Sequence, residues 1–112
     1  MRQSIRIFVD TERRGNISYE PAVCHVERGD TILWRANGNL AIQFKGESPI
    51  GKFRPGNGMS ELAARVRNDA PPGVYHYAVA VAVENKLFLD SGCPTIIIRV
   101  DDDSGGGDPL GE

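Results

Sequence analysis

The chain has 112 residues and a mass of 12.2 kDa, which is the size of one domain and excludes a multidomain enzyme. Its 13 glycines and 7 prolines indicate many turns and exclude a long coiled coil or a helical bundle. The net charge is -2, from 13 Lys and Arg against 15 Asp and Glu. This balance gives no electrostatic reason to expect nucleic acid or a membrane surface as a partner.

The two ends of the chain differ from its middle. Residues 101–112 hold five acidic residues and four glycines but no basic residue, so we expect a disordered acidic tail after a single domain at 1–100. The first ten residues lack the apolar run of a signal peptide. The longest wholly apolar stretch, 78–83, is far shorter than the ~20 residues that span a bilayer. We therefore expect a soluble, cytoplasmic protein.

Alternation of apolar and polar residues predicts short strands separated by turns. In chain order the expected strands are 4–9, 17–26, 31–35, 40–44, 60–67, 74–83, 87–89 and 95–100, with a long loop at 45–58. The apolar phase shifts by one residue after Pro21, which predicts a bulge or a change of sheet. Residues 60–67 alternate as a strand does, although Ser60 could also cap a helical turn. Seven or eight short strands are typical of an all-β, mostly antiparallel Greek-key sandwich.

Three short motifs recur in order along this scaffold. They are Tyr19-x-Pro21-x-x-Cys24-x-Val26, Gly29-Asp30-x-Ile32-x-Trp34-x-x-Asn37 and Pro72-Gly73-x-Tyr75-x-Tyr77. With this order and spacing, residues 4–100 resemble the cupredoxins, the blue-copper family that includes plastocyanin and pseudoazurin. The resemblance implies a cupredoxin-like Greek-key sandwich whose inward-pointing side chains are Cys24, Val26, Ile32, Trp34, Tyr75 and Tyr77.

The same resemblance marks where the copper ligands of the family would stand. The first histidine position is Leu40, the cysteine position is Val79, the second histidine position is Ala82 and the axial methionine position is Leu87. A blue-copper centre needs a thiolate, two imidazoles and a weak axial sulfur, and none of these four residues supplies one. We therefore expect no metal or other cofactor, no electron transfer and no enzymatic activity, with the four apolar side chains filling the vacated pocket.

The second face of strand 74–83 suggests how such a domain could act. It is small and apolar apart from one histidine, whereas the outer face of a sandwich is usually polar. We expect an interaction surface formed by His76, Ala78, Ala80, Ala82 and Phe88. An apolar outer patch is typical of a protein interface, so the chain is interpreted as a binding module for an unknown protein partner or for self-association. The alternative is that the loop at 45–58 shields this face.

Two cysteines offer a different hypothesis. Cys93 lies in a loop of small residues, and a thiol-dependent redox protein could use it with or without Cys24. A shared metal site with the neighbouring histidine is disfavoured, because Cys24 and His25 are adjacent in a strand and point to opposite faces.

Overall fold

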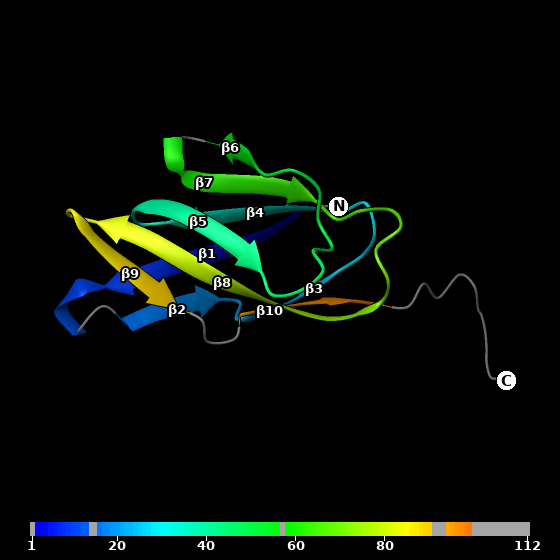
Figure 1. Ribbon diagram of the computed structural model, residues 1–112, viewed down its shortest axis with the longest axis horizontal. Coiled ribbons are helices and arrows are strands. Elements are labelled where there is room, and N and C mark those ends of the chain that lie inside the picture. The colour runs from blue at the N-terminus through cyan, green and yellow to red at the C-terminus, as the bar shows by residue number, and fades with distance from the viewer. Residues whose placement is uncertain (1, 14–15, 57, 91–93, 100–112) are drawn as a thin grey trace, which may run out of the picture.

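The computed structural model describes residues 2–13, 16–56, 58–90 and 94–99, and these residues form two β-sheets (Figure 1). The strands are β1 (Arg2–Asp10), β2 (Asn16–Glu20), β3 (Val23–Val26), β4 (Thr31–Ala36), β5 (Asn39–Phe44), β6 (Arg54–Gly56), β7 (Gly58–Arg65), β8 (Gly73–Val83), β9 (Lys86–Asp90) and β10 (Thr95–Ile98). The only helical segment in these residues is a 3-10 turn, η1 (Thr11–Arg13). The predicted all-β class is confirmed.

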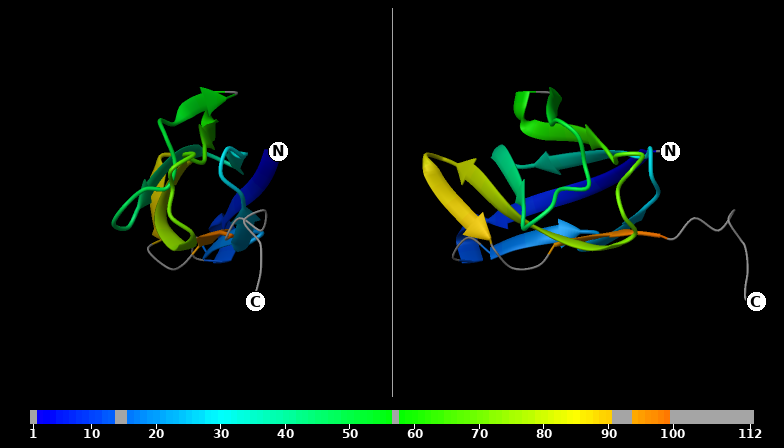
Figure 2. Two further views of the ribbon diagram at one scale, coloured as in Figure 1. Left: turned by 90° about the vertical axis from the view of Figure 1, so that its right-hand side faces the viewer. Right: turned by 45° about the vertical axis from the view of Figure 1, so that its right-hand side comes forward.

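The two sheets face each other around a common interior, as the end-on view in Figure 2 shows. The first sheet has the strand order β2-β1-β4-β7-β6, and the second has the order β3-β10-β8-β5 with β9 also paired to β8. The β1–β4 and β3–β10 pairs are parallel. The other six pairings among the described residues are antiparallel. Both sheets are therefore mixed, and most of their pairings are antiparallel, as expected.

The described residues contain ten strands, whereas the sequence predicted seven or eight. One addition comes from the predicted strand at 17–26, which divides at Pro21 into β2 in the first sheet and β3 in the second. The phase shift after this proline had indicated a bulge or a change of sheet, and the structure has the change of sheet. The other addition is β6, a short strand within the predicted long loop, which pairs with β7. The ambiguous segment at 60–67 is a strand, β7, as predicted.

Strict alternation of side chains directs the core residues of both sheets into the interior. In β1, Ile5, Ile7 and Val9 are buried while the residues between them are exposed. In β8, Tyr77, Val79 and Val81 are buried, and the alanines between them are partly exposed. Burial of these apolar side chains from facing sheets is the main favourable contribution to folding.

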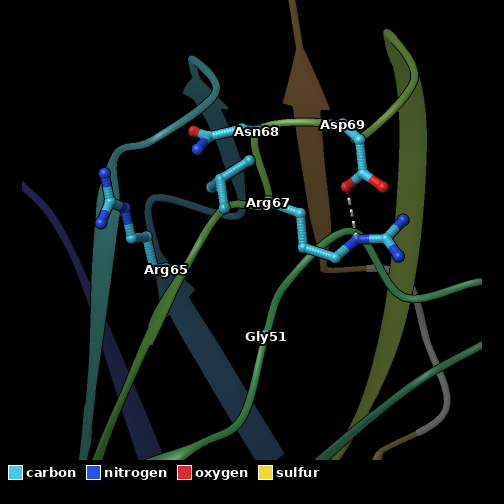
Figure 3. A pocket seen from close by; sticks show the side chains of 6 residues that line it. Gly51, Arg65, Arg67, Asn68 and Asp69 are labelled. Carbon is cyan, nitrogen blue, oxygen red and sulfur yellow. Dashed lines mark ion pairs between the residues drawn. The ribbon is translucent and has the colours of Figure 1, made fainter.

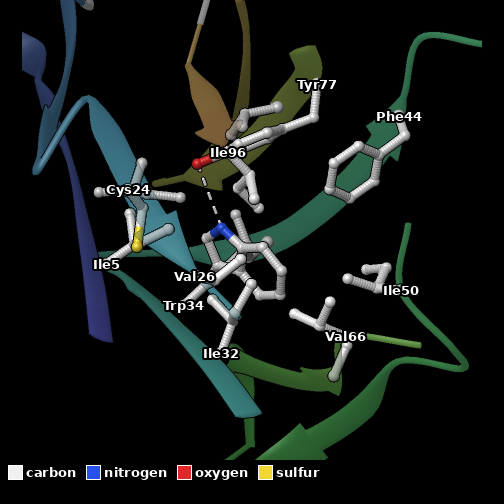
Figure 4. Close-up of a cluster of buried hydrophobic side chains, with 14 of the residues drawn as sticks. Ile5, Cys24, Val26, Ile32, Trp34, Phe44, Ile50, Val66, Tyr77 and Ile96 are labelled. Atoms are coloured by element: carbon white, nitrogen blue, oxygen red, sulfur yellow. Dashed lines mark hydrogen bonds between the residues drawn. The ribbon is translucent and has the colours of Figure 1, made fainter. Parts of the chain in front are cut away.

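Aromatic side chains form the centre of this core (Figure 4). Trp34 of β4 donates a hydrogen bond from Nε1 to the Tyr77 hydroxyl of β8, with 3.2 Å between the two atoms. The two rings meet edge to face, with centroids 5.9 Å apart. Phe53 contacts Trp34 and Phe44 contacts Tyr77, at centroid distances of 5.7 and 5.3 Å. Burial raises the pKa of Tyr77 to about 12, so its hydroxyl stays protonated well above neutral pH.

Three polar side chains bind separate segments together. The Asn37 side chain accepts a hydrogen bond from the Val9 N–H and donates one to the Val9 carbonyl, both at 2.9 Å. Its amide thus pairs with the backbone of β1 as a residue of a neighbouring strand would. Tyr19 of β2 donates a hydrogen bond of 2.7 Å to Asp90 of β9 across the sheets. Burial and the Asp90 carboxylate raise the pKa of this tyrosine. Tyr75 donates to the Pro71 carbonyl, as in the tyrosine corner of β-sandwiches.

Replacement of Tyr77 by phenylalanine tests the bond between the sheets. Tyr77→Phe leaves the buried Trp34 N–H without an acceptor, and we expect it to lower the free energy of unfolding by about 1–3 kcal/mol in urea denaturation. Tyr75→Phe is the matched control, because the hydroxyl of Tyr75 lies where water can replace it. We expect a smaller loss for the control. A Tyr77→Phe protein as stable as the parent would contradict the assigned role.

Candidate functional site

Two of the four positions that the resemblance to cupredoxins assigns to copper ligands lie inside the core. Leu40 of β5 and Val79 of β8 are 4% and 2% exposed. The register places Leu40 opposite Val81 and Val79 opposite Ile42. Leu40 and Val79 are therefore diagonal neighbours on the inner face of the second sheet, where both side chains contribute to the hydrophobic core.

The other two positions lie on the opposite face. Ala82 of β8 and Leu87 of β9 are paired across the hairpin that joins these strands. Both are out of phase with the buried residues of β8, and Leu87 is 64% exposed. Leu87 thus differs from the expectation that it fills the vacated pocket. The four positions do not converge on one point.

The β8–β9 hairpin explains this divergence. β8 continues as a regular strand to Val83, and β9 returns directly after Glu84 and Asn85. These two turn residues have φ angles of 53° and 65°, which is the left-handed geometry of a two-residue hairpin turn. Because the strand continues past Val79, alternation turns Ala82 outward. A regular hairpin therefore occupies the place where the resemblance puts the last two ligands.

Backbone contact closes the same end of the second sheet. Gly38 lies in the turn between β4 and β5, and a Cβ atom on it would come within 2.3 Å of the Ala82 carbonyl oxygen. Only glycine fits at this position, because the Cβ atom of any other residue would clash with this oxygen. The turn packs directly against the last residues of β8 and leaves no room between the two backbones.

The outer side of β5, β8 and β9 carries a shallow apolar groove. We call Ala41, Ala78, Ala80 and Ala82 the alanine face, because cross-strand pairing places Ala41 opposite Ala80 and the other alanines beside them along β8. The groove has a volume of about 480 Å³ and is lined by Ala41, Ile42, Gln43, Ala78, Val79, Ala80, Leu89 and Asp90. Its floor is small and apolar, and Leu89 of β9 rises beside it with 73% of its surface exposed.

The predicted interaction residues are mostly on this outer side. His76, Ala78, Ala80 and Ala82 alternate with the buried residues of β8, as expected. Nδ1 of His76 lies 3.1 Å from the Thr95 hydroxyl, so this ring is held against β10.

Phe88 requires a correction, because its side chain is partly buried and packs against the core. It lies opposite Val81, an inward residue, so Leu87 and Leu89 are the outward residues of β9. These leucines could not be placed from the sequence, because three consecutive apolar residues, 87–89, do not reveal which side of a strand faces inward. The length of the turn would have supplied the missing signal. A two-residue turn makes Val83 and Lys86 partners and thereby places Leu87 opposite Ala82.

The predicted long loop does not cover the alanine face. Ile50 is buried and forms an isolated bridge with Val66 next to β7. Phe53 packs against Trp34 in the core. None of the described residues 45–56 and 58 lines the groove. Within the described part of the chain, this loop therefore does not shield the alanine face, which was the alternative expectation.

The cysteines divide between the described and undescribed residues. Cys24 is a free, buried thiol, and its neighbour His25 is exposed on the opposite face, as alternation predicts. Burial raises the pKa of the Cys24 thiol, and the charge of Asp30 raises it further. A protonated, buried thiol is a poor nucleophile. Cys93, the residue on which the redox hypothesis depends, lies outside the described residues, as does the predicted tail at 101–112.

A second depression, of about 420 Å³, lies beside the end of β7 (Figure 3). Arg65 and Arg67 line it, which at first suggests an anion site. The guanidinium of Arg67, however, is 3.3 Å from the Glu47 carboxylate and 3.6 Å from that of Asp69. These two acidic groups offset its charge. The depression therefore offers an anion little net attraction, and the alanine face is the stronger candidate.

Comparison of the chain with protein-family models and with curated proteins found no match to either. The described residues contain no helix with the length and hydrophobicity to cross a membrane. They also contain no group of three His, Cys, Asp or Glu side chains arranged to hold a metal ion. The interpretation of the site therefore depends on its own residues and geometry.

Substitution of Gly38 tests the tight contact at this end of the sheet. In Gly38→Ala, the new Cβ clashes with the Ala82 backbone, so we expect the free energy of unfolding to fall by about 1–3 kcal/mol in urea denaturation. Gly51→Ala is the matched control, since its Cβ would meet its nearest atom at an ordinary 3.9 Å. Equal stability of the two variants would show that the turn between β4 and β5 does not approach the end of β8 as described.

Proposed function

We propose that this chain is a cupredoxin-like domain without a copper centre and that it acts as a binding module for a protein. The likeness to cupredoxins is supported by the burial of the residues that the motifs direct inward. Cys24, Val26, Ile32, Trp34 and Tyr77 are buried, and Tyr75 packs against the same core. The two mixed sheets agree with this scaffold, as does the passage of the chain at Pro21 from β2 in the first sheet to β3 in the second.

The proposal excludes blue-copper electron transfer on chemical grounds. Such a site requires a thiolate and two imidazoles converging on one ion. Leu40 and Val79 offer only hydrocarbon at the inner positions, and Ala82 and Leu87 lie on the opposite face. Neither the residue types nor their directions suit a blue-copper ion. A function for this scaffold must then come from its surface.

One observation carries the binding role, namely the apolar groove on the outer side of a central strand. β8 is paired on both sides, so its backbone is rigid, and its outward alanines leave the sheet accessible to a partner's side chains. Leu87 and Leu89 add exposed hydrocarbon at the border. Burial of such surface is worth about 25 cal/mol for each Å² removed from water, which favours association with another apolar surface. Exposed apolar patches of this kind are typical of protein interfaces.

The groove can be tested with a fluorescent anilinonaphthalene dye, a general probe for exposed apolar surfaces. We expect the dye to bind and to shift the amide NMR signals of Ala41, Ala78, Ala80 and Leu89. Ala80→Arg puts a charge on the alanine face, and we expect it to weaken dye binding at least about tenfold. Ala22→Arg, at an exposed position between β2 and β3, is the matched control and should leave binding unchanged.

Two results would contradict the proposal. Dye binding that Ala80→Arg does not weaken would place the accessible apolar surface elsewhere. In a parallel arm, the parent chain is titrated with copper(II) and examined by visible absorption and metal analysis. We expect no stoichiometric uptake and no intense absorption band, and the appearance of both would restore the electron-transfer function that the proposal excludes.

A further inference from the structure

β9 is an edge strand with unusual composition. Within the described residues it pairs with β8 alone. Edge strands usually carry charges, prolines or bulges that prevent another strand from pairing with them. β9 instead presents Leu87 and Leu89, which are 64% and 73% exposed. Its charges are restricted to its two ends, Lys86 and Asp90.

The hairpin register determines which backbone groups of β9 face away from β8. In an antiparallel ladder, hydrogen-bonded pairs alternate with pairs that are not bonded. A two-residue turn makes its flanking pair, Val83 and Lys86, a bonded one. Phe88 is then also directed at β8, whereas the N–H and C=O groups of Leu87 and Leu89 point toward the outer edge. The exposed leucines therefore also carry the backbone groups that a further strand would bind.

The sequence of β9 is complementary to itself in the antiparallel direction. It reads Lys-Leu-Phe-Leu-Asp from residue 86 to residue 90. When two copies run antiparallel about a centre at Phe88, Lys86 lies opposite Asp90 of the second copy, and Leu87 lies opposite Leu89 of the second copy. Opposite charges that face each other across strands stabilise a pair, while like charges destabilise it. The register that aligns the charges also pairs the leucines.

We propose that the partner of this chain is a second copy of itself, joined edge to edge through β9. The interface is isologous, with a two-fold axis at Phe88. Leu87 and Leu89 of each copy exchange backbone hydrogen bonds with Leu89 and Leu87 of the other, and Phe88 meets Phe88 of the second copy in a pair that is not hydrogen-bonded. The second sheets of the two copies then form one continuous sheet.

This inference rests on the proposed binding role and names a second copy of the chain as the partner at the β9 edge, which borders the alanine face. Leu89 belongs both to the groove and to the β9 edge, so the joined sheets align the two alanine faces across the axis. β6, the edge strand of the first sheet beside β7, is less suited to pairing. β6 contains Pro55 and an irregular register, both of which oppose the addition of a strand.

Sedimentation velocity on the full chain, over a wide range of protein concentrations, tests the proposal through charge exchange. We expect the parent to form a dimer. Lys86→Glu places acidic residues opposite each other, and Asp90→Lys does the same with lysines, so each variant alone should dimerise at least about tenfold more weakly. An equimolar mixture of the two variants restores opposite charges at both contacts. We expect this mixture to form a heterodimer about as tight as the parent dimer.

Thermal unfolding must accompany the measurement, because Asp90→Lys also removes the hydrogen bond from Tyr19. If this variant is unfolded, mixing Lys86→Glu with the parent gives the same information, since the heterodimer then has one attractive contact and should be intermediate in strength. Lys52→Glu, at an exposed position between β5 and β6, is the matched control and should dimerise like the parent.

A monomeric parent, or a dimer that both charge variants leave unchanged, would overturn the inference. A monomer whose alanine face still binds the dye would refute only the second copy as partner. Failure of dye binding together with a monomeric state would refute the binding role as well.

Discussion

The double pairing of β8 decides which way each side chain in the candidate site points. From Val79 to Ala82, every residue of this strand is paired with β5 on one side and with β9 on the other. Side chains of a strand alternate strictly, so a shift by one residue would exchange the inner and outer sets. Such a shift is costly, because it would break the pairing of β8 with β5 and with β9 at the same time. The core and the alanine face are thus two consequences of one register.

The inner set completes the aromatic centre of the core. Tyr77 and Val79 point toward the first sheet, and the Tyr77 hydroxyl accepts the hydrogen bond from Trp34. Leu40 and Val79 pack in this interior, so hydrocarbon fills the part of the core where the proposed likeness to cupredoxins would put two of the metal ligands. Apolar filling avoids the cost of burying unsatisfied polar groups. Hydrocarbon at these two positions therefore suits the rigid binding scaffold that we propose.

Sequence patterns predicted much of this fold, because long alternation is a reliable physical signal. The run from Tyr75 to Val83 was sufficient to place the outward alanines of β8, and the phase shift at Pro21 indicated either a bulge or the change of sheet. The direction of Phe88 could not be read in the same way, since β9 is short and apolar on both faces. Counting residues along the chain also placed Leu87 at the vacated ligand site. Counting takes no account of the turn at Glu84 and Asn85, which brings Leu87 opposite Ala82.

The most direct test of this account is the register of the β8–β9 hairpin, measured by nuclear Overhauser effects. Ala82 and Leu87 form a pair that is not hydrogen-bonded, in which Cα atoms are only about 4.5 Å apart. The account predicts a strong effect between their Hα protons and none between the methyl groups of Leu87 and those of Leu40 or Val79. Effects between the Leu87 methyl groups and both Leu40 and Val79 would contradict it, because they would place Leu87 inside the vacated pocket.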